Sequence, residues 1–211
     1  MRKHRFGGDK LRRAIAVEAA RIKYEGRESE YFHAKRKAAK RFGVNHKYPY
    51  NLPSNGEIKE ELLRFADMFE GEDRLLRLGD MRLQALKLMR LLKRFHPKLI
   101  GSVLKGTIRK GSDIDIHVFT DSVHAVATLL AEEQIFCQID RKTVIDKDGK
   151  GREFVHLRGE IDDFPIELTV YSSQLKNFRF MSSVTNSPIE TAKISEVEDL
   201  LAAEHPDLVG K

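Results

Sequence analysis

The spacing of apolar residues changes at Pro97, and this change constrains the fold more than any other feature of the chain. Before Pro97, apolar residues recur every three or four positions, as on one face of a helix. The longest such stripe consists of Leu78, Met81, Ala85, Leu88, Leu92 and Phe95. After Pro97, apolar and polar residues alternate, which is typical of strands. The sequence therefore predicts an α+β fold in which a mixed β-sheet is flanked by helices.

Individual elements are predicted from the same patterns and from turn and cap residues. Helices are expected over residues 9–24, 29–42, 54–69, 72–95, 122–135 and 195–206. Strands are expected over Lys98–Val103, Asp113–Phe119, Phe136–Ile145, Arg152–Arg158 and Phe164–Tyr171. The residues expected to end or begin these elements are Gly71, the capping pairs Ser54–Glu57 and Ser195–Glu198, the cap Asp121, and the hairpin turn Asp148–Gly149.

Charge is unevenly distributed along the chain. Residues 1–50 hold 15 of the 38 Lys and Arg but 5 of the 32 Asp and Glu, a local formal charge of +10. A basic segment on a mildly acidic body is typical of a protein that binds a polyanion, RNA above all. Solvated helices with outward Lys and Arg would explain the same charge. The sequence leaves both interpretations open.

The loop VNHKYPYNLPSN, rich in proline and asparagine, is the best candidate for a domain boundary. We predict a basic helical arm over residues 1–53, a core over 54–175 with lead-in helices 54–95, and a C-terminal helical tail over 176–211. No apolar run approaches the length of about 18 residues that a membrane helix needs, so no membrane partner is expected. A single cysteine, Cys137, fits the reducing cytoplasm and is expected in the core. The oligomeric state stays open.

Two acids interrupt the apolar strand DIDIHVF. Ile114 and Ile116 point to one face of this strand, so Asp113, Asp115 and His117 point to the other. Burying a charge without a partner is costly, so the two acids need a reason to be there. Two carboxylates on one face, about 6–7 Å apart at their Cα atoms, can converge on a shared hard cation. Such oxygen ligands are typical of Mg²⁺ that also binds phosphate.

The loop before this strand has the residues that a triphosphate requires. Gly101 allows a phosphate to approach the backbone, and Ser102 adds a hydroxyl and an N–H as donors. Lys105, Arg109 and Lys110 supply positive charge. A further oxygen ligand is expected from the strand FPIELTVY, where apolar residues alternate inward and leave Glu167 on the outward face.

The pattern GSxxxGxxRxxSDIDIxV resembles the nucleotidyltransferase signature of the DNA polymerase β superfamily, and most closely its minimal nucleotidyltransferase branch. The resemblance covers roughly residues 75–175 and includes Gly106, Arg109 and Ser112. It implies a nucleotidyltransferase core for the predicted fold. The family often has aspartate where this chain has Glu167, so a role for Glu167 as general base is less secure than one as metal ligand.

The resemblance implies specific roles. Asp113 and Asp115 would bind two Mg²⁺ ions, for which Mn²⁺ could substitute, and Glu167 would bind one of them. Gly101 and Ser102 would hold the β- and γ-phosphates. The implied nucleotide-binding residues are Gly101, Ser102, Lys105, Arg109 and Ser112. The implied reaction moves a nucleoside monophosphate from an NTP to a hydroxyl of RNA or protein. The alternative is a nucleotide-sensing or RNA-binding adaptor that has lost turnover.

Several other polar residues have two interpretations. His117 could line the site, but a solvated or hydrogen-bonded histidine is the commoner case. Lys176 and Arg179 could reach phosphates or an acceptor, and could equally be surface charges. Asp162 and Asp163 are expected to form a turn rather than to carry chemistry.

Overall fold

The computed structural model describes residues 3–28, 30–44, 52–145, 151–182 and 187–206. The chain forms two compact units, Met1–Gly71 with Ser182–Ser187, and Glu72–Met181 with Pro188–Lys211. The sequence placed its boundary earlier, after residue 53, and its assignment of domains stays a prediction. No helix in the described part of the chain is long and apolar enough to span a membrane.

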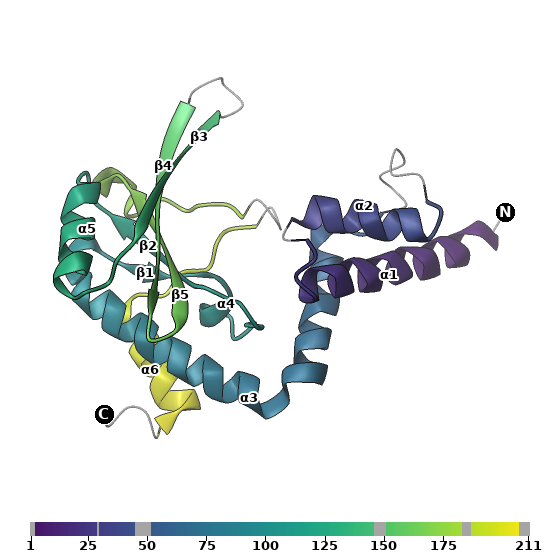
Figure 1. The fold of residues 1–211 in the computed structure, drawn as a ribbon, viewed down its shortest axis with the longest axis horizontal. Helices are drawn as coiled ribbons and strands as arrows, with labels where there is room; N and C mark the ends of the chain where they lie inside the picture. Colours follow the sequence, from purple (N-terminus) through teal and green to yellow (C-terminus); the bar gives the residue numbers. More distant parts are fainter. Residues whose placement is uncertain (1–2, 29, 45–51, 146–150, 183–186, 207–211) are drawn as a thin grey trace. The chain divides into compact units, whose positions relative to one another are not determined.

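The N-terminal unit is a small helical assembly. It contains α1 (Lys3–Tyr24), α2 (Tyr31–Arg41) and the first part of α3 (Asn55–Leu91) (Figure 1). Its buried core is rich in alanine, with residues such as Ala19, Ala34 and Ala38 fully buried beside Ile15 and Ile58. Small side chains let helices approach closely, because they leave little volume between the two backbones.

Gly71 interrupts α3, as the sequence predicts. Its φ of 48° and ψ of −132° are not helical, so α3 consists of two helices that meet at Gly71, as the sequence predicts. The capping pair at the start of α3 is confirmed: Ser54 N donates to Glu57 Oε2 at 2.6 Å, and Glu57 N donates to Ser54 Oγ at 3.1 Å. The helix ends at Leu91, and a short 3-10 helix, η2 (Lys93–Phe95), follows.

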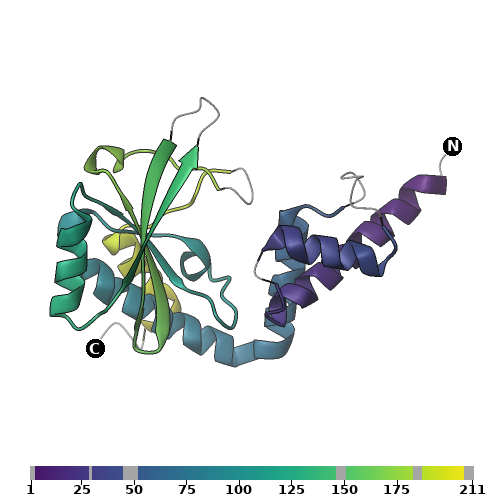
Figure 2. The same cartoon turned by 45° about the horizontal axis from the view of Figure 1, so that its top comes forward.

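The second unit is built on one mixed sheet of five strands, so the predicted α+β class is confirmed (Figure 2). The strands are β1 (Lys98–Leu99), β2 (Ile114–Phe119), β3 (Gln138–Ile145), β4 (Gly151–Ile161) and β5 (Phe164–Tyr171). Their order is β1-β2-β5-β4-β3. The central pair, β2 and β5, is parallel, whereas the other pairs are antiparallel.

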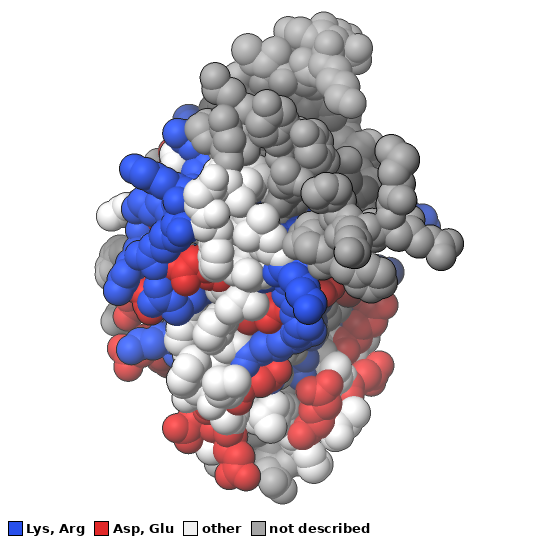
Figure 3. Space-filling view, turned by 90° about the vertical axis from the view of Figure 1, so that its right-hand side faces the viewer, with Lys and Arg blue, Asp and Glu red and all other residues white. Residues whose placement is uncertain are grey.

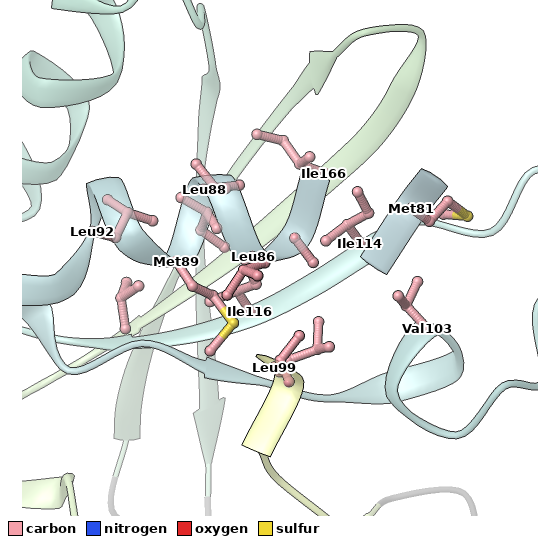
Figure 4. Close-up of a cluster of buried hydrophobic side chains, with 14 of the residues drawn as sticks. Met81, Leu86, Leu88, Met89, Leu92, Leu99, Val103, Ile114, Ile116 and Ile166 are labelled. Atoms are coloured by element: carbon pink, nitrogen blue, oxygen red, sulfur yellow. The ribbon is translucent and has the colours of Figure 1, made fainter. Parts of the chain in front are cut away.

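The second part of α3 covers one face of this sheet. Its buried side chains, among them Leu88 and Met89, pack with Ile114, Ile116 and Ile166 (Figure 4). The unit also contains α5 (Val123–Glu132) and α6 (Ile194–Glu204), which contribute to the same core. Because apolar residues alternate along β2 and β5, the opposite face of the sheet carries their polar side chains. That face is where the predicted acids lie.

Three predictions about local structure are wrong. The strand expected over Lys98–Val103 ends at Leu99, and Gly101–Leu104 forms a single helical turn, α4. This turn is too short to show a helical period in the sequence. Asp121 does not cap α5: the cap is Ser122, whose Oγ accepts from Ala125 N at 3.2 Å.

The third error concerns the start of α6. The helix begins one residue earlier than predicted, and its N-terminal hydrogen bond runs from Lys193 N to Glu196 Oε2 at 2.7 Å, not between Ser195 and Glu198. The predicted pairing of the third and fourth strands is confirmed, since β3 and β4 are antiparallel neighbours. The predicted turn Asp148–Gly149 lies outside the described residues.

Candidate active site

The parallel pairing of β2 and β5 brings the predicted acids together. Asp115 and Glu167 are register partners, so their side chains leave the same face of the sheet on neighbouring strands. Neighbouring strands lie about 4.8 Å apart. Asp113 lies just before β2, two residues from Asp115. Three residues separated by as many as 54 positions in the sequence are therefore gathered at one place on the sheet.

Gly101 lies directly against one of these acids. A Cβ atom on Gly101 would lie 2.3 Å from Asp115 Oδ2, and its φ of 74° is in the left-handed region. Both facts require glycine here. Ile100 N also donates to Asp115 O at 3.0 Å. The two halves of the sequence motif, Gly101–Ser102 and the acid pair, are thus in direct contact.

A buried arginine donates hydrogen bonds to the segment that follows Gly101. Arg82, from the second part of α3, is 2% exposed and donates to Val103 O at 3.0 Å and to Leu104 O at 3.2 Å. It also forms an ion pair with Glu204 of α6. Sequence reasoning missed Arg82, although a cation beside an apolar helical stripe is a signal that such a side chain has buried partners.

Burial and like charge raise the pKa values of both aspartates. The pKa of Asp115 is raised from 3.8 to about 7, mainly by burial and further by the charges of Asp113 and Glu167. The pKa of Asp113 is raised by burial and by Glu167, and the charges of Arg109 and Arg158 oppose this effect. The acids are therefore close enough to repel one another, which favours a cation between them.

The third acid, Glu167, is held by two neighbours from β4. Its Oε2 accepts from Arg158 Nε at 2.7 Å, and its Oε1 lies 2.9 Å from His156 Nδ1. Arg158 also contacts Asp140 of β3 at 3.2 Å. Sequence analysis missed His156 and Arg158, although they alternate in VHLRG as side chains on one face of a strand do.

The donor set fits a hard divalent cation. Asp113 and Asp115 offer carboxylate oxygens, which suit Mg²⁺ or Mn²⁺ rather than a thiophilic metal. As the side chains stand, no three His, Cys, Asp or Glu residues in the described part of the chain are arranged to hold a metal. Both carboxylate oxygens of Glu167 are engaged by Arg158 and His156. The fit thus rests on the two aspartates.

The cations and hydroxyls of the predicted phosphate loop have different surroundings. Lys105 Nζ lies 3.4 Å from Glu190 Oε1. Ser112 Oγ accepts from Arg109 N at 3.0 Å, and Ser112 N donates to Arg109 O at 3.0 Å. Ser112 therefore shapes the turn that carries Arg109. The charge of Arg109 acts to lower the pKa of Asp113.

His117 shares the face of the acids but is buried among aromatic rings. It is 3% exposed, and its ring centroid lies 4.8 Å from that of Tyr171 and 5.4 Å from that of Phe180. Burial lowers the pKa of His117 to about 4, with help from the charge of Lys98. A neutral, packed histidine is therefore the state that the structure supports. Cys137 is half-buried, and burial raises the pKa of its thiol.

Comparison with known families supports the sequence motif. The model of the nucleotidyltransferase domain family matches residues 98–211, more than half of the chain. The chain therefore belongs to this family, in agreement with its resemblance to the polymerase β superfamily. The matched region includes residues 176–211, which lie outside the resemblance seen in the motif. No curated protein matches the chain.

Proposed function

We propose that the protein is a magnesium-dependent enzyme that transfers a nucleoside monophosphate from an NTP to an acceptor hydroxyl. One observation carries this proposal: Asp113, Asp115 and Glu167 meet on one face of the sheet, and the backbone of Gly101 packs against Asp115. Membership of the nucleotidyltransferase domain family supports the same chemistry.

The acids would hold the metal in this proposal. Asp113 and Asp115 are the ligands, for two ions by the family resemblance, and Glu167 is a further ligand to one ion. When bound, Mg²⁺, or Mn²⁺ in its place, neutralises phosphate charge and lowers the pKa of the attacking hydroxyl. Repulsion among the three acids in the free protein favours binding of a cation here, because a cation relieves it.

The remaining residues orient the reactants. Gly101 and Ser102 present backbone N–H groups and a hydroxyl to the phosphates, and Lys105 and Arg109 supply positive charge. Ser112 fixes the turn beneath Arg109 through its two hydrogen bonds. Glu167 is oriented by Arg158, and it is the candidate to accept a proton from the attacking hydroxyl.

RNA or protein is the proposed acceptor, and the basic arm is one place where it could bind. Figure 3 shows one face of the molecule on which Lys and Arg side chains gather in two groups, with uncharged residues between them. Many cations of the arm already have acidic partners, however. Arg12 pairs with Glu57 at 2.7 Å, and both Arg21 and Arg41 pair with Glu18.

The cytoplasm remains the expected location of the protein, because a single cysteine fits a reducing compartment.

Titration with each of the four NTPs tests the nucleotide site, with and without Mg²⁺. The wild type should bind one or more NTPs only with Mg²⁺, and Asp115→Asn should lose this binding. Arg109→Ala should bind the triphosphate at least several-fold more weakly, whereas Lys87→Ala, which removes an exposed cation of α3, should not change it. Absence of NTP binding by the wild type would refute the proposal. Binding without turnover would favour the adaptor.

A further inference from the structure

A cavity lies at the β1 edge of the sheet, in the same unit as the acids. Its volume is about 890 Å³. Five cations from separate parts of the chain line it: Arg90, Lys93, Lys98, Lys176 and Lys193. They come from the end of α3, from η2, from β1, from the segment after β5, and from the start of α6. Two hydrogen bonds between Leu99 and Ala192, at 2.8 and 2.9 Å, hold the segment before α6 beside β1.

The charge of this cavity, here called the cationic pocket, is largely uncompensated. Its lining includes one acid, Glu198, whose Oε1 accepts from Arg90 at 2.7 and 3.2 Å. Within the described part of the chain, no ion pair involves Lys93, Lys176 or Lys193. Burial lowers the pKa of Lys98, and the charge of Lys193 lowers it further against the opposing charge of Glu196. An anionic ligand would relieve this repulsion among cations.

The cationic pocket begins close to the acids. Lys98 is the register partner of His117, so both lie on the sheet face that carries Asp115. Asp115 is two residues from His117, which corresponds to about 7 Å along the strand. The Lys98 ammonium also lies 5.1 Å from the ring centroid of Phe119, on this face. Lys98 lies on β1 and Asp115 on the adjacent strand β2, so no other strand separates this lining residue of the pocket from the proposed active site.

We propose that the cationic pocket binds backbone phosphates of a single-stranded nucleic acid, whose hydroxyl is the acceptor of the nucleotide. This inference rests on the proposed function and names the class of its acceptor. Cations spread over five segments suit several phosphates in a row rather than one compact group. Lys and Arg contacts to phosphates position a strand without reading its sequence.

One further observation favours a strand over a free nucleotide. Phe178 follows the lining residue Asn177 and is 51% exposed. An exposed aromatic ring beside a basic groove is a surface on which a base can stack.

The test measures binding of a labelled single-stranded RNA of about 12 nucleotides to the full chain, in EDTA and without NTP. The pocket variant is Lys93→Gln/Lys176→Gln/Lys193→Gln, which removes three exposed side chains. Its backbone contacts persist, since Lys176 O and Lys193 N make their hydrogen bonds through the main chain. We expect affinity to fall at least tenfold, and the slope of log K against log salt to become about 2 smaller in magnitude.

The control is Arg64→Gln/Lys87→Gln, which removes two exposed cations of α3 that lie outside both the basic arm and the cationic pocket. Its affinity should stay within about threefold of the wild type. An equal loss in both variants, or no loss in the pocket variant, would overturn the inference. Displacement of the RNA by an equimolar amount of free ATP would also overturn it, because the pocket would then be a nucleotide site.

Nucleotide binding separates this inference from the proposed function. The pocket variant should bind Mg²⁺–NTP as the wild type does, and Asp115→Asn should bind RNA as the wild type does. If no protein binds NTP while the pocket variant alone loses RNA, the proposed chemistry fails and the RNA site stands. If NTP binds normally and the pocket variant keeps its RNA affinity, the acceptor site fails alone.

Discussion

Replacement of Asp115 by asparagine should stabilise the metal-free protein at neutral and alkaline pH. The carboxylate is largely buried beside Asp113 and Glu167, so its charged form is disfavoured in the folded state. Asparagine has nearly the same shape and carries no charge. It would therefore remove the repulsion while it keeps the packing against Gly101.

The size of the effect follows from the pKa of Asp115. A rise from 3.8 to about 7 corresponds to about 4 kcal/mol, at about 1.4 kcal/mol for each pH unit. A raised acid pKa means that the folded state binds the proton more tightly than the unfolded chain does. The wild type therefore loses up to this amount of stability between about pH 4 and pH 7, and Asp115→Asn does not. For a chain of this size, each kcal/mol corresponds to roughly 2–4 °C in Tm.

Thermal unfolding of both proteins in EDTA, from about pH 4 to pH 8, measures this difference. The two Tm values should coincide near pH 4 and diverge as pH rises, with the variant the more stable. Mg²⁺ added at pH 8 should raise the Tm of the wild type and narrow the gap. Asp121→Asn is a control of opposite sign, because hydrogen bonds from Ser173 and Ser172 lower the pKa of this exposed acid.

Two results would refute this reasoning. A lower Tm for Asp115→Asn at pH 8 in EDTA would mean that the carboxylate is satisfied in the folded protein. A constant gap between the two proteins from pH 4 to pH 8 would mean that Asp115 does not titrate in this range, so its repulsion by Asp113 and Glu167 would be absent.

Two pairs of variants test the support of the site. Gly101→Ala should abolish turnover and lower stability, because the added Cβ would clash with Asp115. Gly111→Ala should add only backbone strain of about 1–2 kcal/mol, because no atom lies within 4 Å of the added Cβ. Equal activity of these two variants would contradict the assigned contact. Arg82→Leu should destabilise the fold by about 3 kcal/mol in urea unfolding, because the carbonyls of Val103 and Leu104 lose their buried donor, and Glu204→Gln should cost less than half as much. A larger cost for Glu204→Gln would show that the ion pair, and not the carbonyl contacts, holds the loop.

The sequence predicted the fold class and the place of the acids because both depend on local spacing. Alternation along β2 and β5 determines which side chains share a face, and the motif relates Gly101 to Asp115 at a fixed distance in the chain. The predicted helix break at Gly71 and the capping pair at Ser54 are also local, and both are confirmed. Local signals fail where an element is a single turn, as in α4.

The neighbours of the acids could not be predicted, since they depend on strand register and tertiary packing. Arg158 contacts Glu167 because β4 pairs with β5 at that register, which the lengths of the strands alone do not determine. Arg82 reaches the Gly101 loop across 21 residues of sequence. The cationic pocket combines Lys93 with Lys193, and no pattern within one segment relates residues so far apart.

Transfer of a labelled α-phosphate to RNA would demonstrate nucleotidyl transfer by this protein directly. The full chain would be incubated with Mg²⁺, single-stranded RNA and the NTP that it binds, labelled at the α-phosphate, and both RNA-bound label and free pyrophosphate would be measured. We expect label to enter the RNA in equal amounts to the pyrophosphate released, and Asp113→Asn to produce neither. Release of inorganic phosphate instead of pyrophosphate, or transfer that survives in Asp113→Asn, would contradict the proposed function.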